Sequence, residues 1–319
     1  MRAHEDRDFV ATETANDSPG IEQDDFSSAE GEFSRATLTV ATFNIRYGVG
    51  QRLISGGILR RFGVKNARRR PSLVARNLTL AARAFTEGKL LPRADIIALQ
   101  EADKRTRRAG DHHIARELAA ALGMRYAHAA MTKPRGVPPA PRQWYLDFEE
   151  QIELDDDGES GIALLSRLPL LDLERIELPW FECAWRPRLA LATKVLWRDL
   201  PVHIFCVHID PHASTDDRLV QHRAVLAKVE ERATSGSTII LGDFNTLSKD
   251  SCRATRALFA EHGFSSPQPT GTPTWRSGPI KLHADWIFVR GLNVVRWGVA
   301  RGLRRVSDHW PVWAELDSP

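Results

Sequence analysis

The chain nears its end with the stretch Val306-Ser307-Asp308-His309-Trp310-Pro311-Val312, which places an Asp-His pair just before the apolar run 312–316. Alone this pair is weak evidence, because most histidines are structural or simply exposed. Five earlier segments strengthen this evidence. Four of them have polar residues at the C-terminal end of a strand-like apolar run, and the fifth begins a strand with an acid. The five segments are residues 42–44, 99–101, 206–210, 241–245 and 284–289. Core packing does not require such ends, so the pattern predicts polar side chains that meet at one rim of a sheet.

Composition is typical of a soluble globular protein with one large domain or two small ones. The chain has 319 residues, of which 42% are hydrophobic and 27% charged. No apolar run reaches the ~18 residues of a membrane span, and the polar N-terminus lacks the apolar core of a secretion signal. Three cysteines are too few and too scattered for a disulfide framework or a cysteine-rich zinc site. These features together predict a cytoplasmic protein, with Cys206 as a buried thiol in an apolar strand.

Charge divides the chain unequally. Residues 1–34 contain ten acids and two arginines, a net charge of −8, which leaves +11 for the remainder of a chain whose total is +3. A basic body favours an anionic partner such as a nucleic acid, a phospholipid headgroup or another phosphate ester.

The distribution of apolar residues divides the chain into a tail and one domain. Residues 1–35 lack periodicity and large apolar residues, which predicts a disordered acidic tail, and residues 36–319 form the expected domain. Two irregular segments interrupt it, a basic insertion at 52–70 and a loop at 132–160. Helices are expected from Pro71 to Phe85, between Asp111 as N-cap and Gly123 as C-cap, and from Ser214 as N-cap. Ten strands with about four helices predict an α/β fold of two stacked mixed sheets flanked by helices, and a monomer is expected.

The polar segments, in this order, resemble the motifs of the endonuclease/exonuclease/phosphatase superfamily, which is DNase I-like. The quoted residues are Thr42-Phe43-Asn44, Leu99-Gln100-Glu101, Val207-His208-Ile209-Asp210, Gly242-Asp243-Phe244-Asn245, Asp285-Trp286-Ile287 and Ser307-Asp308-His309. The resemblance covers residues from about 37 to 316, and Gly-Asp-Phe-Asn and Ser-Asp-His are its most specific parts. It implies a four-layer α/β sandwich and a hydrolase that cleaves phosphoester bonds with a divalent metal.

The resemblance also implies a role for each residue. Glu101, with Asn44 beside it, is the expected ligand pair for Mg²⁺ or Mn²⁺, and such ions prefer oxygen ligands. His309 is the expected general base, because an imidazole exchanges protons near neutral pH, and Asp285 orients its ring. Asp308 lies near the metal or the leaving group, or else only supports the loop. The remaining assignments are Asp243 as a proton-transfer or water-positioning group, Asn245 as a donor to the phosphate and His208 as a donor to a non-bridging oxygen.

Other features leave alternatives open. Asp210 suits a structural turn as well as a site role. Trp180, Phe181 and Trp185 suit a small local core as well as a surface that stacks on a base or faces a lipid, whereas His112 and His113 are expected to be exposed.

The substrate is the least determined property. Residues 44–48 read Asn-Ile-Arg-Tyr-Gly and lack the signature of abasic-site endonucleases, which weakens a role in DNA repair. A phosphodiesterase or phosphomonoesterase is therefore the main hypothesis. An endonuclease acting on DNA or RNA is one alternative, and a binding protein that keeps the fold without activity is another.

Overall fold

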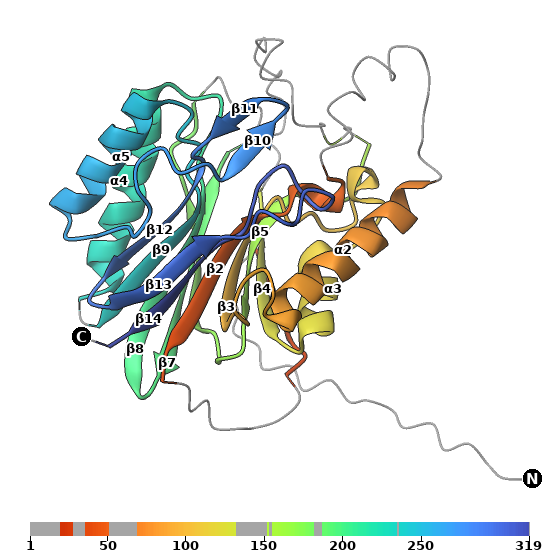
Figure 1. Ribbon diagram of the computed structural model, residues 1–319, viewed down its shortest axis with the longest axis horizontal. Helices are drawn as coiled ribbons and strands as arrows, with labels where there is room; N and C mark the ends of the chain where they lie inside the picture. Colours follow the sequence, from red (N-terminus) through yellow and green to blue (C-terminus); the bar gives the residue numbers. More distant parts are fainter. Residues whose placement is uncertain are drawn as a thin grey trace, which may run out of the picture.

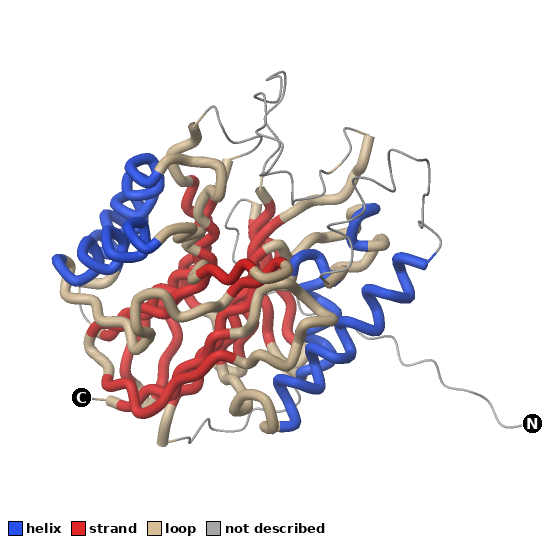
Figure 2. Tube along the Cα trace, turned by 45° about the horizontal axis from the view of Figure 1, so that its top comes forward, coloured by secondary structure: helices blue, strands red, loops and turns tan. Residues whose placement is uncertain are grey.

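The computed structural model describes residues 20–27, 36–50, 69–131, 152, 155–181, 187–234 and 236–318. Two β-sheets lie face to face at the centre, with helices α4 and α5 on one outer side and α2 and α3 on the other (Figure 1). Figure 2 shows the same arrangement, with the strands between two groups of helices. The predicted four-layer α/β sandwich is confirmed.

The first sheet has seven strands in the order β1-β4-β5-β3-β2-β14-β13. Only β2 and β3 run parallel within it, and every other neighbouring pair is antiparallel. Its strands are β1 (Ile21–Asp25), β2 (Leu38–Asn44), β3 (Ile96–Gln100), β4 (Arg125–Ala130), β5 (Gly161–Ser166), β13 (Asn293–Val299) and β14 (Val312–Asp317).

The second sheet has five strands in the order β12-β9-β8-β7-β6, with β8 and β9 parallel. Its strands are β6 (Leu171–Glu177), β7 (Leu189–Trp197), β8 (Leu200–His208), β9 (Ser237–Asp243) and β12 (Asp285–Arg290). A separate hairpin consists of β10 (Trp275–Ser277) and β11 (Ile280–Leu282).

The central strands β2, β3 and β5 read as largely apolar runs because both of their faces are covered. Successive side chains of a strand point to opposite faces. In β2, Leu38 and Val40 therefore pack between the sheets, whereas Ala41 and Phe43 pack in the core cluster beneath α2 and α3. The second sheet likewise packs its outer face against α4 and α5.

Three helices, α2, α3 and α4, begin and end close to the predicted residues, and no range is predicted for α5. The helices are α2 (Arg70–Glu87), α3 (Ile114–Leu122), α4 (Thr215–Arg232) and α5 (Lys249–Glu261), with short 3-10 turns η1 (Arg46–Gly48) and η4 (Arg107–Ala109). Ser214 caps α4 by accepting the N–H of Asp217, and Gly123 ends α3 in the left-handed conformation, so both predictions are confirmed.

The start of α3 differs from the prediction. Its N-cap is His113, whose ring accepts the N–H of Arg116, and Asp111 lies in the turn before the helix. His113 is buried and His112 half-buried, so the expectation that both are exposed is wrong. Both rings are held by carboxylates, His112 by Glu117 and His113 by Glu22.

The acidic N-terminal segment also differs from its prediction. Residues 21–25 form β1 and pair with β4 at the edge of the first sheet. The prediction of a disordered tail over residues 1–35 is therefore wrong for residues 21–25. Residues 1–19 and 28–35 lie outside the described residues, as do residues 51–68 of the basic insertion, most of the 132–160 loop and Trp185. None of the helices that the structure describes is both long and apolar enough to cross a membrane.

Candidate active site

Polar strand ends from both sheets meet at one rim. In the second sheet His208 of β8 and Asp285 of β12 are each paired with Asp243 of β9, so three polar residues stand side by side. In the first sheet Asn44 ends β2 opposite Gln100 of β3. The amide of Asn44 donates to Asp243 Oδ2 across the two sheets at 2.9 Å. The convergence predicted from the sequence is therefore present.

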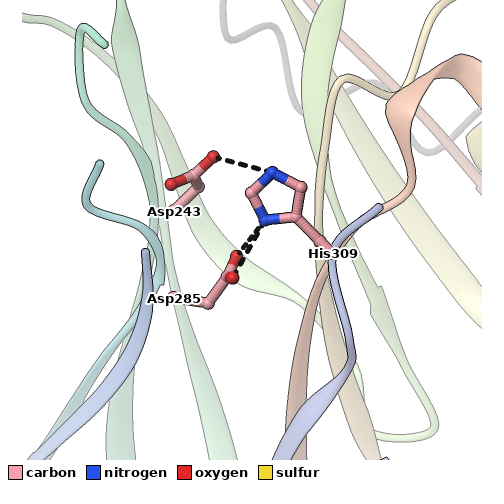
Figure 3. Close-up of side chains that lie close together, drawn as sticks. All are labelled: Asp243, Asp285 and His309. Carbon is pink, nitrogen blue, oxygen red and sulfur yellow. Dashed lines mark hydrogen bonds and ion pairs between the residues drawn. The ribbon is translucent and has the colours of Figure 1, made fainter. Parts of the chain in front are cut away.

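His309 lies between two buried carboxylates (Figure 3). Its Nδ1 is 2.9 Å from Asp285 Oδ2 and 3.1 Å from Oδ1, and its Nε2 is 3.8 Å from Asp243 Oδ2. All three side chains are buried. The carboxylate of Asp285 accepts a hydrogen bond from Nδ1–H. Nε2 is therefore the ring nitrogen that can exchange a proton.

Burial and charge shift the pKa values of this group. Burial raises the pKa of Asp243; the positive charge of His309 opposes that shift and the nearby Asp285 adds to it. Burial by itself lowers the pKa of His309, but the charges of Asp285 and Asp243 outweigh it and raise the pKa above its ordinary value. The protonation of Asp243 and that of His309 therefore depend on each other.

Asn44 holds two carboxylates in place. It is fully buried, and its Nδ2 donates to Glu101 Oε1 at 3.0 Å as well as to Asp243. Its Oδ1, the atom expected to bind a metal, accepts the backbone N–H of Arg46 at 3.0 Å. Glu101 follows β3 directly with a φ of 52°, which turns the chain sharply at the strand end. Asn44 thus fixes the position of the Glu101 carboxylate and links it to Asp243.

The residues present fit a hard divalent cation. The side chains around Asn44 offer carboxylate oxygens, from Glu101 and Asp243, and no thiolate, which suits Mg²⁺ or Mn²⁺. Asp243, Asp285 and His309 also have ligand atoms within 4.8 Å of one another. Asp285 and His309 are already hydrogen-bonded to each other. We therefore interpret Asp243, Asp285 and His309 as an acid–base group beside the Glu101 oxygens.

Asp308 is held by a buried ion pair. Its Oδ2 is 3.2 Å from Nη1 of Arg46 and accepts the indole N–H of Trp275 at 3.1 Å. Asp308, Glu101 and the nearby Tyr47 outweigh burial and raise the pKa of Arg46. These contacts favour the alternative in which Asp308 supports the loop that carries His309. Sequence reasoning missed Arg46, whose only signal was its position two residues after Asn44.

The two remaining predicted residues line the same rim. His208 is buried with Nε2 3.8 Å from Asp243 Oδ2, and Nη1 of the buried Arg188 lies 3.4 Å from its Nδ1. Asn245 donates its backbone N–H to Asp243 Oδ1 and its side-chain amide to the carbonyl of Ile209. Sequence reasoning also missed Arg188, which stands just before an apolar strand and gave no pattern of its own.

The features left open by the sequence fall outside this group. Asp210 Oδ1 accepts the backbone N–H of His212, which is the structural turn role. Trp180 is 39% exposed.

The Gly-Asp-Phe-Asn motif has a steric reason for its first residue. Gly242 has a φ of 155°, and a Cβ there would lie 2.0 Å from the carbonyl oxygen of Val207 on the neighbouring strand. Only glycine fits this close approach, and it places Asp243 against His208 and His309.

The fold and this site define a four-layer α/β protein with a buried His-Asp pair and an oxygen-rich rim. The sequence matches the model of the Endonuclease/Exonuclease/phosphatase family over residues 41–309, and the chain belongs to this family. Its members are hydrolases that act on phosphoesters and generally depend on a divalent metal. No curated protein matches the chain.

Solved structures show the same fold. An endonuclease/exonuclease/phosphatase from Bacteroides vulgatus superposes with a TM-score of 0.59 and 18% identity, covering 89% of this chain and 100% of that chain. The mannosyl-6-phosphatase Bt3783 of Bacteroides thetaiotaomicron gives 0.56 and 18%, covering 88% and 99%. ANGEL2, a 2',3'-cyclic phosphatase, gives 0.56 and 14%, covering 93% and 98%. At these identities the likeness concerns the fold alone.

Proposed function

We propose that the protein is a divalent-metal-dependent phosphoesterase that hydrolyses a phosphomonoester or phosphodiester with an activated water. The observation that carries the proposal is the buried His309–Asp285 pair, in which His309 Nε2 faces Asp243 at the rim that also carries Glu101. A structural histidine has no need of two buried acids, whereas a general base needs one to fix its tautomer.

Each side chain then has a role in the displacement. His309 Nε2 takes a proton from the water whose oxygen attacks phosphorus, and the bond from phosphorus to the leaving oxygen breaks. Asp285 holds the ring through Nδ1–H. Asp243 positions the water or passes on its proton. His208 and Asn245 are the proposed donors to the phosphate oxygens, which stabilises negative charge in the transition state.

Glu101 is the proposed metal ligand, and Asn44 fixes its position. When bound, the ion supplies positive charge, which stabilises negative charge on the phosphoryl group and opposes protonation of His309. Arg46 and Asp308 hold the loop before His309 against the end of β2, as their ion pair and the bond from Ser307 Oγ to the carbonyl of Asn44 support.

We favour a small phosphate ester as the substrate. Arg46-Tyr47-Gly48 stand where abasic-site endonucleases carry their signature, and two of the similar structures are named as phosphatases.

The test is hydrolysis of p-nitrophenyl phosphate and bis(p-nitrophenyl) phosphate by the full chain with Mg²⁺ or Mn²⁺. Activity should disappear with excess EDTA and return with the metal. His309→Ala should lose most turnover, whereas His262→Ala, at a half-exposed histidine on the end of α5 and outside the proposed site, should lose none. Undiminished hydrolysis in EDTA would refute the metal role, and a fully active His309→Ala would refute the proposed base.

A further inference from the structure

A small cavity lies beside Trp310, the residue that follows His309. It has a volume of about 200 Å³ and is lined by Pro273, Lys281, Arg301, Arg304 and Trp310; we call it the Trp310 pocket. Three of these five residues are cations, and the lining formed by the described residues contains no carboxylate. The volume is below the ~300–1,000 Å³ of pockets that take drug-sized ligands, so the pocket suits a small anionic group.

No acid among the described residues neutralises the three cations. Lys281, Arg301 and Arg304 are exposed, and among the described residues none of them forms an ion pair with an acid. The guanidinium of Arg301 makes a cation–π contact with the ring of Trp310, 5.7 Å from its centroid. Like charges around one hollow repel one another, and an anion between them relieves this repulsion.

The wall of the pocket also holds an unsatisfied donor. Trp310 is 2% exposed, and within the described part of the chain its indole N–H has no hydrogen-bond acceptor. A buried N–H without an acceptor costs free energy, and most such groups in proteins are paired. This N–H is buried below the surface of the pocket, so the groups that can contact an anion there are the three cations.

The pocket is built on fixed backbone. Ala300 N donates to the carbonyl of Pro311, which closes the base of the loop that carries both arginines, and Leu303 and Val306 anchor this loop in the core. On the other side, Trp310 N donates to the carbonyl of Thr274 at the start of the β10–β11 hairpin, which carries Lys281. A fixed backbone lowers the loop entropy that is lost when an anion binds.

We propose that the Trp310 pocket is an anion site that binds a phosphate group through Arg301, Arg304 and Lys281. The phosphate is either a second anionic group of the substrate, which rests on the proposed function, or a separate phosphate ion. In both cases one lining residue, Trp310, directly follows His309 in the chain.

Binding tests the site without requiring turnover. Inorganic phosphate is titrated calorimetrically into the EDTA-treated full chain at low salt. Arg301→Gln/Arg304→Gln should weaken phosphate binding at least about tenfold, since charge-assisted hydrogen bonds are lost. Trp310→Phe keeps the aromatic ring that contacts Arg301 and should bind like the wild type. The matched control Arg76→Gln/Arg83→Gln, on α2, removes the same charge and should bind like the wild type. Equal affinity in all four proteins would overturn the proposal.

Kinetics then separates the two sources of the phosphate. If the site holds a second phosphate of the substrate, Arg301→Gln/Arg304→Gln should raise KM for a sugar bisphosphate at least about tenfold and leave p-nitrophenyl phosphate unchanged, because only the bisphosphate reaches both sites. If it holds a separate ion, both KM values stay the same while the calorimetric loss persists. An enzyme inactive on every ester would refute the proposed function but leave the calorimetric test of the pocket intact.

Discussion

At the scale of single residues, the decisive contact is the hydrogen bond between His309 and Asp285. Asp285→Asn replaces a carboxylate acceptor by an amide whose NH₂ group cannot accept the Nδ1 proton, so the ring no longer has one fixed tautomer. We expect kcat to fall by ~10²–10⁴-fold, as for loss of a general base, with little change in KM. Steady-state kinetics measures this, and circular dichroism checks that the variant folds.

Asp308→Asn serves as the comparison. Asp308 contacts Arg46 and Trp275 and touches neither Asp243 nor Asp285 in the described structure, so its loss should be milder than that of Asp285→Asn. Equal losses in both variants would mean that Asp308 takes part in the chemistry and does more than support the loop.

Gly242 permits a second prediction at this scale. Gly242→Ala puts a methyl group 2.0 Å from the carbonyl oxygen of Val207 and forces β8 and β9 apart beneath Asp243. We expect a loss of at least about 2 kcal/mol in the free energy of unfolding, together with reduced activity. The control is Gly88→Ala, which has a φ of 69° with no atom within 4 Å, so it carries only the backbone strain, on the order of 1 kcal/mol. If urea denaturation gives the same loss at both positions, the close approach is not what requires glycine.

At the scale of elements, β1 is the segment that the sequence did not predict. The run Ile-Glu-Gln-Asp-Asp has one apolar residue, so neither periodicity nor propensity indicates a strand. It is stabilised by pairing with β4 and by Glu22, whose side chain contacts Tyr126 Oη at 2.5 Å, Lys104 Nζ at 2.7 Å and His113 Nε2 at 2.8 Å. These hydrogen bonds hold the pKa of Glu22 well below its usual range despite partial burial, and the bond with His113 has the largest effect.

Truncation tests whether β1 belongs to the domain. Deleting residues 1–19 leaves β1 intact and should not change stability. Deleting residues 1–27 exposes the edge of β4 and removes the partner of His113 and Tyr126, so we expect a loss of about 1–3 kcal/mol. Glu22→Gln should reproduce part of this loss without shortening the chain. Identical melting temperatures for the two truncated proteins would show that β1 contributes nothing to the fold.

The strands that carry the site were predictable because their signal is local. An apolar run that ends in Asn44, Glu101 or Asp243 shows in the sequence both the strand and its end. Contacts between distant residues give no local signal. The bonds from Asn44 to Asp243 and from Arg46 to Asp308 join segments far apart in the chain, and the burial of Arg46 follows only from the packing of both sheets.

At the scale of the whole molecule, the site depends on the stacking of the two sheets. Asn44 and Glu101 come from the first sheet, whereas His208, Asp243 and Asp285 come from the second. Any loss of packing between the sheets therefore separates the proposed metal ligand from the proposed acid–base group. Global stability and activity should accordingly be lost together on denaturation.

Three buried histidines make that stability depend on pH. Burial lowers the pKa of His128 to about 4 and those of His222 and His283 to about 3. Below about pH 6.5, the ordinary value, the unfolded chain binds protons at these rings while the folded chain does not, so stability falls as pH falls toward 4. Asp243 acts in the opposite direction, because its raised pKa lets the folded state bind a proton that the unfolded state lacks. His309, whose pKa is raised, adds no slope here, because its contribution is already complete below about pH 6.5.

On acidification the unfolded chain binds three protons at these histidines, whereas the folded chain binds one at Asp243. The difference predicts a net loss in the free energy of unfolding of roughly 2–3 kcal/mol for each pH unit between about 6 and 5. His222 tests the origin of this slope. Its ring packs against Phe244 and Phe259, and neither ring nitrogen has a hydrogen-bond partner among the described residues. His222→Phe keeps an aromatic ring there and should lower the slope by about 1.4 kcal/mol per pH unit, one proton's share, without loss of stability at pH 7. Urea denaturation at pH 7, 6 and 5 measures both quantities, with His262→Phe as the control at a half-exposed ring. A slope that His222→Phe leaves unchanged would mean that this ring is already protonated in the folded protein or that other groups set the acid response.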